Sequence, residues 1–336
     1  MTVDTAHWNA KRVYFLGVNT GFVSDGEPDA RYIDFYRQRS SARLYCAIVG
    51  NVVVPNGHGS NRSTAFLGPN PVWSELAFAI RAKGALPGIQ LATAWDGYEG
   101  SRNFLSADGD QVIPRAKDLV RDFGIARIEG VLSSFNSAAN LAVDHGFAHI
   151  QFHAAHGYLL SLLIDERICS QAERVREGLA RISEGMRDQG LETSLRISMR
   201  TGNIDFDRNG PEQLQDTLAD LPFDLIDLSS GFYNINKRLI YPSLEDVVTA
   251  RLAESIEIAR RNPARQFIVS GQISQQVSKL PENAQIGICR DLIANPRFLF
   301  EIGNGCRNHG KCHYFSRGAE HVTCPQWHQG EAGGKV

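Results

Sequence analysis

Two histidines and a tyrosine stand close together in the segment His153-Ala-Ala-His156-Gly-Tyr158. Histidines three residues apart can ligate zinc, but the segment lacks the HExxH pattern and no third ligand stands nearby. They can also cap the end of a strand in a structural role. The remaining interpretation is a pair of hydrogen-bond donors that hold a substrate carbonyl or oxyanion, with Tyr158 as the general acid.

Further polar residues stand within or directly after short apolar runs elsewhere in the chain. They are Gln90, Arg196, the pair Ser270-Gly271 and the pair Cys289-Arg290. Each residue alone is weak evidence for a functional site, since a glutamine can simply form hydrogen bonds to a loop and an arginine can pair with a core carboxylate. A glycine lets the backbone approach an oxyanion, and an arginine can bind one through two hydrogen bonds. These residues predict a common site only if the fold brings them together.

Eight short apolar runs alternate with helical patterns and predict strands that are buried on both faces. The runs are residues 13–18, 44–49, 88–92, 148–152, 194–197, 225–228, 267–269 and 286–289. The alternation predicts an α/β fold, a (β/α)8 TIM barrel; a doubly wound sheet is the alternative, but no GxGxxG follows the first run. The strands of a TIM barrel end at one mouth, where the loops after strands seven and eight commonly bind phosphate. The polar residues are therefore expected to share one site for a ligand that carries a phosphate.

The composition limits the class of protein. The chain has 336 residues, a formal net charge of −2 and 43% hydrophobic residues, which predicts a globular protein without the basic excess of a nucleic-acid binder. No apolar stretch approaches the roughly 18 residues of a membrane span, and residues 1–12 lack the apolar core of a secretory signal. Six cysteines are too few for a disulfide scaffold. We expect a cytoplasmic protein with a small-molecule substrate and no nucleic acid or membrane partner. A homo-oligomer is possible, and the sequence does not define the oligomeric state.

Four motifs together resemble the Old Yellow Enzyme, or NADH:flavin oxidoreductase, family of FMN-binding (β/α)8 barrels. The resemblance covers about residues 12–298. Its most specific stretch is residues 135–160, which contains HAAHGYLL, and the second is GICRDLIANP at residues 287–296. The other two motifs are centred on Gln90 and Arg196. All four occur in the family's order.

The resemblance implies an NAD(P)H-dependent flavin oxidoreductase that reduces an electron-poor, enone-like substrate with ping-pong kinetics. His153 and His156 would hold the substrate oxygen, and Tyr158 would protonate the α-carbon after hydride reaches the β-carbon. Gln90 would bond the pyrimidine edge of the flavin, and Arg196 would lie near N1 and O2. The residues expected to hold FMN are Gly17, Val18, Asn19, Gly50, Gln90, Arg196, Ser270, Gly271, Cys289 and Arg290.

Some positions depart from the family pattern. Asn19 stands where Thr or Cys is frequent, and Gln272 follows Gly271 where a second glycine is common, which predicts altered flavin tuning and an altered phosphate loop. Residues 161–172 are shorter than in relatives and lack an Asn-x-Arg-x-Asp-x-Tyr-Gly-Gly pattern, which predicts a pocket that is more open or differently covered. Aromatic residues in the loops after strands three and six either line this pocket or simply pack. They are Trp95, Tyr98, Phe104, Phe232, Tyr233 and Tyr241.

Residues 303–336 form a tail rich in Cys and His, which we separate from a barrel at residues 1–302. Larger relatives, such as 2,4-dienoyl-CoA reductase and trimethylamine dehydrogenase, hold a [4Fe–4S] cluster with four cysteines after the barrel. The resemblance implies zinc or an unusual iron–sulfur cluster on Cys306, His309, Cys312 and Cys324, with His313 and His321 as competing ligands. A decayed site with free thiols is the alternative. Because the chain ends at Val336, we expect it to lack the FAD- and NADH-binding domains of those relatives and any bound metal to be structural.

Other functions remain open at this stage. The same flavin chemistry can run as an oxidation or desaturation. A metal-dependent hydrolase would use His153 and His156, and a non-catalytic barrel would bind flavin without turnover. The sequence defines neither the substrate nor the choice between NADH and NADPH.

Overall fold

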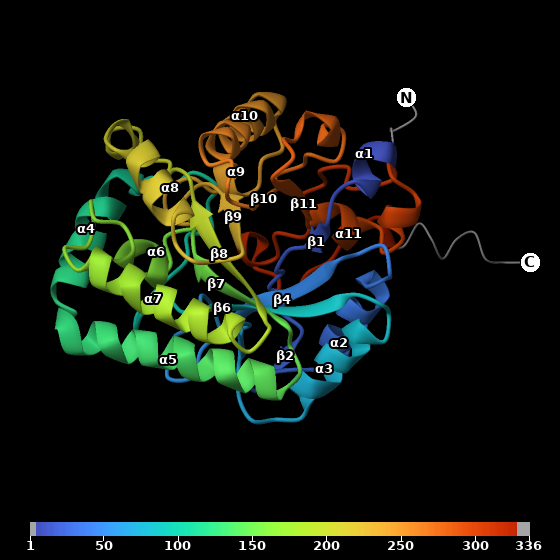
Figure 1. The fold of residues 1–336 in the computed structure, drawn as a ribbon, viewed down its shortest axis with the longest axis horizontal. Coiled ribbons are helices and arrows are strands. Elements are labelled where there is room, and N and C mark those ends of the chain that lie inside the picture. Colours follow the sequence, from blue (N-terminus) through green and yellow to red (C-terminus); the bar gives the residue numbers. More distant parts are fainter. Residues whose placement is uncertain (1–4, 328–336) are drawn as a thin grey trace, which may run out of the picture.

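The computed structural model describes residues 5–327, which form a closed barrel of eight parallel strands (Figure 1). The strands are β1 (Val13–Phe15), β4 (Cys46–Val53), β6 (Leu86–Ala92), β7 (His149–Ala154), β8 (Glu192–Ser198), β9 (Leu225–Ser229), β10 (Phe267–Val269) and β11 (Ala284–Ile288). The barrel closes because β1 pairs in parallel with both β11 and β4. The predicted (β/α)8 fold is confirmed. A doubly wound sheet is excluded, because the two edge strands of such an open sheet would not pair with each other.

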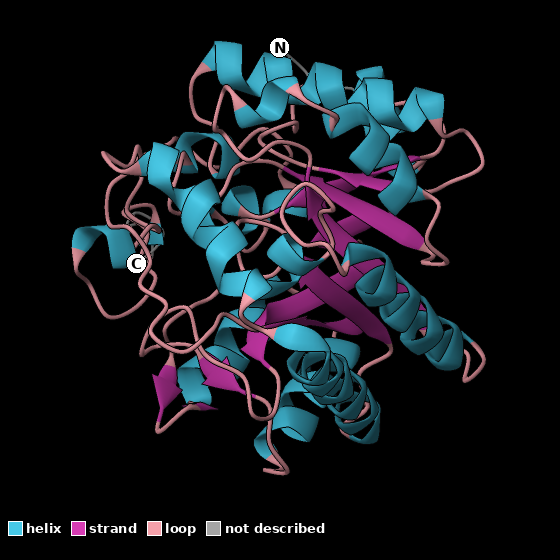
Figure 2. Cartoon of the chain, turned by 90° about the vertical axis from the view of Figure 1, so that its left-hand side faces the viewer, coloured by secondary structure: helices cyan, strands magenta, loops and turns pink. Residues whose placement is uncertain are grey.

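Helices connect the strands and surround the barrel (Figure 2). They are α2 (Ala30–Arg39), α3 (Val72–Arg81), α4 (Gly109–Arg121), α5 (Gly124–Asp144), α6 (Leu159–Leu163), α7 (Ala172–Arg187), α8 (Pro211–Ala219), α9 (Lys237–Ile240), α10 (Glu245–Arg261) and α11 (Arg290–Ala294). Only the 3₁₀ turn η2 (Val277–Lys279) lies between β10 and β11 in the described chain. Smaller elements are α1 (Thr5–Asn9), β2 (Val23–Ser24), β3 (Glu27–Pro28), β5 (Ala65–Phe66), η1 (Phe206–Arg208), η3 (Phe298–Phe300) and η4 (Phe315–Arg317). Within residues 5–327, every helix is too short or too polar to span a bilayer.

The strands bury side chains on both faces. Helix α7 shows how the outer face is covered, because Val175, Leu179, Ile182 and Met186 recur at helical spacing and are all buried. The opposite face of the strands lines the barrel interior. Six buried residues there form their own apolar cluster: Tyr14, Leu16, Cys46, Ile48, Leu225 and Ile268. This alternation explains why the strands read as continuous apolar runs.

The tail packs against the carboxyl end of the barrel. Val322 N–H donates to the carbonyl of Thr20 after β1 at 2.7 Å, and Cys306 N–H donates to Asp291 Oδ1 on α11 at 2.9 Å. The Nζ of Lys237, on α9, donates to Ser316 Oγ at 2.6 Å. Residues 305–327 are therefore held by segments that follow the first and the last barrel strands, at the face where the strands end.

Candidate active site

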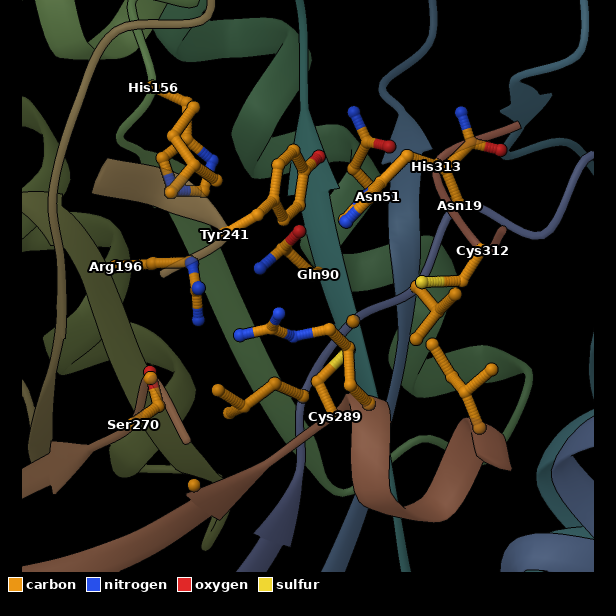
Figure 3. Close-up of a pocket in the computed structure, with 18 of the residues that line it drawn as sticks. Asn19, Asn51, Gln90, His156, Arg196, Tyr241, Ser270, Cys289, Cys312 and His313 are labelled. Carbon is orange, nitrogen blue, oxygen red and sulfur yellow. The ribbon is translucent and has the colours of Figure 1, made fainter. Parts of the chain in front are cut away.

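The predicted site residues meet in one pocket at the carboxyl end of the barrel (Figure 3). Gln90 on β6, Arg196 on β8 and Ser270 after β10 reach it from three separate elements. The pocket lining contains every predicted cofactor and catalytic residue except Gly50. These residues are Gly17, Val18, Asn19, Gln90, His153, His156, Tyr158, Arg196, Ser270, Gly271, Cys289 and Arg290.

Gly50 supports the pocket but does not line it; its neighbour Asn51 does. A Cβ at Gly50 would lie 2.8 Å from the Cβ of Gln90, so β4 needs a glycine to pass beside that side chain. The Gly50 N–H donates to Tyr36 Oη at 3.2 Å, and the Val18 N–H donates to the same oxygen at 3.3 Å. Tyr36 thereby joins β4 to the loop after β1, where the flavin-binding residues are predicted.

His153 and His156 form a perpendicular pair, with ring centroids 5.0 Å apart. The Ala155 N–H donates to His153 Nδ1 at 3.3 Å, which leaves the proton of a neutral ring on Nε2. His156 Nε2 lies 2.7 Å from Ser229 Oγ. Burial lowers the pKa of both histidines well below 6.5, and the charge of Arg196 lowers it further. Both rings are therefore neutral hydrogen-bonding groups near pH 7.

Tyr158 lies beside this pair, with its ring centroid 5.2 Å from that of His153. Burial raises the pKa of Tyr158, so the phenol keeps its proton at neutral pH. Gly157, between His156 and Tyr158, has φ +77°, and a Cβ there would lie 2.9 Å from Cγ of Phe232. The glycine in the His-Gly-Tyr segment therefore permits both the turn and the close packing that place the two flanking side chains in the pocket.

A chain of hydrogen bonds inside the barrel holds two of the predicted flavin ligands. Gln90 Nε2 donates to Gln151 Oε1 at 2.5 Å, and Gln151 Nε2 donates to Asp227 Oδ2 at 3.1 Å. The same carboxylate oxygen accepts from Arg196 Nη1. Sequence reasoning missed Gln151 and Asp227, although a carboxylate within the apolar run of β9 was a signal that a buried partner was required.

The opposite end of the pocket is cationic. Arg290 at the start of α11 donates from Nη1 to Asn308 Oδ1 of the tail at 3.3 Å. Arg251 on α10 donates from Nη2 to Ser270 Oγ at 3.0 Å. Gly271 has φ +107° and lies against the Arg251 side chain. Sequence reasoning missed Arg251 because it lies within a helical pattern and carries no signal of a strand end.

The tail forms part of the pocket wall through residues 312–315, which sequence reasoning did not foresee. The His313 ring packs on Tyr241, with centroids 4.3 Å apart. Asn308 Nδ2 donates to Gln272 Oε1 at 3.1 Å, so the unusual residue after Gly271 contacts the tail. The tail therefore covers part of this pocket, which the prediction from residues 161–172 left to an unspecified segment. Of the six aromatic candidates, Tyr233 and Tyr241 line the pocket, whereas Trp95, Tyr98, Phe104 and Phe232 do not.

The predicted metal ligands are not assembled. Within the part of the chain that the structure describes, no group of three or more His, Cys, Asp or Glu side chains could hold a metal ion. Cys306 and Cys324 lie near enough to raise the pKa of Cys312, but these thiols and His309 do not form such a group. Burial raises the pKa of Cys312 to about 11, which keeps it a thiol. These residues do not fit a zinc or iron–sulfur site, and the zinc interpretation of His153 and His156 finds no third ligand either.

Comparison with known proteins identifies relatives of one kind, although no family model matches the chain. NADPH dehydrogenase of Clostridium acetobutylicum is 24% identical over 314 residues, which cover 84% of this chain and 85% of that protein. The NADH-dependent flavin oxidoreductase nadA of Aspergillus parasiticus is 22% identical over 317 residues, covering 83% of this chain and 70% of its own. These similarities support the resemblance to the Old Yellow Enzyme family that the sequence motifs indicate. The predicted class of oxidoreductase is thereby confirmed.

Two further similarities cover a smaller share of the matched protein. The 4,4'-dithiodibutanoate disulfide reductase of Rhodococcus erythropolis is 29% identical over 184 residues, which cover 52% of this chain and 43% of that protein. The solved complex of 2-naphthoyl-CoA reductase superposes with a TM-score of 0.67 at 14% identity. That match covers 94% of this chain but 54% of the larger one, and it supports the fold alone.

Proposed function

We propose that the chain is an NAD(P)H-dependent FMN oxidoreductase that reduces the C=C bond of an electron-poor conjugated carbonyl compound. The observation that carries the proposal is the convergence of the neutral pair His153 and His156 and the protonated Tyr158 with Gln90 and Arg196 in one pocket. Relatives named NADPH dehydrogenase and NADH-dependent flavin oxidoreductase support it.

The donor set of the pocket fits FMN. Gln90 and Arg196 would bind the ring system, and Ser270, Gly271 and Arg290 would bind the phosphate. Arg251 and Arg290 both line the pocket, and neither forms an ion pair with a carboxylate of the described chain, which suits an anionic ligand. When bound, the flavin supplies the hydride that an electron-poor carbon accepts.

The histidine pair polarises the substrate. His153 presents Nε2–H as a donor, because its Nδ1 accepts from the backbone, and Ser229 fixes the ring of His156. A carbonyl oxygen held by these rings draws electron density from the conjugated C=C bond, which makes the β-carbon electrophilic. Because the rings are buried, fixed and neutral, this polarisation needs little reorganisation as charge develops on the oxygen.

Tyr158 supplies the proton. The reduction adds a hydride to the β-carbon and a proton to the α-carbon, and the phenol is a protonated group within the same pocket. Its pKa, raised by burial, keeps the donor form fully populated at neutral pH. The wall made by Tyr233, Tyr241 and His313 favours a flat, unsaturated substrate that can lie against aromatic rings.

The experiment is an absorbance spectrum of the purified protein, followed by anaerobic reduction and a substrate panel. We expect flavin absorbance near ~450 nm, FMN as the released cofactor, bleaching by NADH or NADPH, and reoxidation by enones or nitroalkenes. A protein that binds no added FMN would overturn the proposal. Reoxidation only by electron acceptors that lack a conjugated C=C bond would instead favour an oxidase or desaturase.

A further inference from the structure

Arg251 is a buried cation that the proposed reaction does not use. It lies on α10, is 5% exposed and lines the pocket. Its Nη1 donates to the carbonyls of Leu239 and Ile240 at 3.0 and 3.2 Å, and its Nη2 donates to the carbonyl of Leu228 at 3.2 Å and to Ser270 Oγ at 3.0 Å. Its Nε is buried and has no hydrogen-bond partner among residues 5–327.

No carboxylate of the described chain forms an ion pair with Arg251 within 4 Å. The two acidic residues that influence it serve other arginines: Asp227 bonds Arg196, and Glu254 bonds Arg200. Burial, followed by the charge of Arg196, lowers the pKa of Arg251 to about 9. A buried charge without an anion is costly, so the fold keeps this arginine at the expense of stability unless a ligand compensates it.

The position of the side chain indicates where that ligand lies. Arg251 Nη2 bonds Ser270, the residue that precedes Gly271 in the predicted phosphate loop. A Cβ at Gly271 would lie 2.9 Å from Arg251 Nε, so only a glycine lets the loop and the guanidinium come this close. Arg290 lines the same end of the pocket. A glycine loop between two arginines is a concave, cationic surface that fits a tetrahedral dianion.

We propose that the guanidinium of Arg251 binds the phosphate of the flavin cofactor, together with Arg290 and the 270–271 loop. This inference rests on the proposed function, since FMN is the dianion that the pocket would hold. It also predicts that the protein discriminates strongly between FMN and riboflavin, which lacks the phosphate. An arginine from the helix after the sixth barrel strand would then complete a site otherwise built from the last two strands.

The test compares FMN and riboflavin binding to flavin-stripped protein, measured by quenching of flavin fluorescence. Arg251→Met should weaken FMN binding by roughly 10- to 100-fold, as expected for loss of a charged hydrogen bond, and change riboflavin binding less than about 3-fold. Arg251→Lys retains the charge without the planar guanidinium, so its FMN affinity should fall between those of wild type and Arg251→Met. Arg261→Met, on the same helix but paired with Asp216 outside the pocket, is the matched control and should change neither affinity.

The outcomes separate this inference from the proposed function. Wild-type protein that binds neither flavin contradicts the proposed function itself. Wild-type protein that binds FMN while Arg251→Met leaves the ratio of the two affinities unchanged overturns only the role of Arg251. Equal loss of FMN and riboflavin affinity also overturns it, because that result indicates a purely structural role. If Arg251→Met does not fold, Arg251→Lys decides the question: a selective loss of FMN affinity supports the role of Arg251, and an unchanged ratio of the two affinities overturns it.

Discussion

The carboxylate of Asp227 binds the guanidinium of Arg196 inside the barrel, and Asp227 is itself fully buried. Gln151 donates to the same carboxylate oxygen and links it to Gln90. Asp227 does not line the pocket, yet it fixes the position of Arg196, the cation proposed to lie beside the flavin ring. This arrangement makes Asp227 a positioning residue for Arg196.

Asp227→Asn should destabilise the protein, because Arg196 would remain buried without a charged partner. Removing one member of a buried pair typically costs about 3–5 kcal/mol of unfolding free energy, and the retained amide oxygen should keep the loss near the lower figure. Urea denaturation of the flavin-free protein measures it. Asp220→Asn removes the acidic partner of Arg265 at the surface, where the acidic side chain is 79% exposed, and should cost less than about 1 kcal/mol. Equal losses in the two variants would contradict the positioning role.

Tyr158→Phe should slow reduction of the conjugated substrate by about 10²- to 10⁴-fold, because the proposed proton donor is removed. The rate at which NAD(P)H bleaches the flavin should not change, since that step needs no proton from Tyr158. Stopped-flow measurement of the two half-reactions separates them. Tyr98→Phe is the control: its ring packs 5.6 Å from that of Tyr158, yet Tyr98 does not line the pocket. A variant with unaltered substrate reduction would show that another group donates the proton.

Local sequence patterns were sufficient to predict the barrel and the site residues near the carboxyl ends of its strands. Gln90 and Arg196 lie in the carboxyl-terminal half of their strands and Ser270 follows its strand, so the geometry of a parallel barrel brings them to one mouth. Arg251 and His313 could not be found in this way, because a helix interior and an irregular tail say nothing about which strand end they approach. The metal prediction rested on the spacing of Cys306, Cys312 and Cys324, and spacing alone does not make side chains converge.

The buried histidines should make stability fall in mild acid. Burial lowers the pKa of His153, His156 and His313, the last to about 3. The unfolded chain therefore binds more protons than the folded chain below about pH 6.5, and the unfolding free energy decreases as the pH falls from 7 to 5. Each histidine contributes about 1.4 kcal/mol per pH unit below its unfolded pKa.

His313→Asn isolates one of these contributions. Urea denaturation at several pH values should show that the variant loses less unfolding free energy than wild type between pH 6 and 5. The difference should be about 1.4 kcal/mol, the contribution of one histidine. His309→Asn is the matched control for the substitution itself, because that histidine is in the same tail but exposed. Identical slopes in wild type and His313→Asn would show that His313 titrates in the folded protein.

Gly157→Ala tests whether the turn between His156 and Tyr158 depends on close packing as well as on backbone conformation. Gly157 and Gly97 have nearly the same φ, +77° and +74°, but a Cβ at Gly157 would lie 2.9 Å from Phe232, whereas a Cβ at Gly97 would meet nothing within 4 Å. Gly97→Ala should therefore cost only the left-handed penalty, about 1–2 kcal/mol. Gly157→Ala should cost about 1–3 kcal/mol more from overpacking and should also slow substrate reduction, since His156 and Tyr158 would shift. Equal unfolding free energies for the two variants would show that Phe232 moves aside without cost.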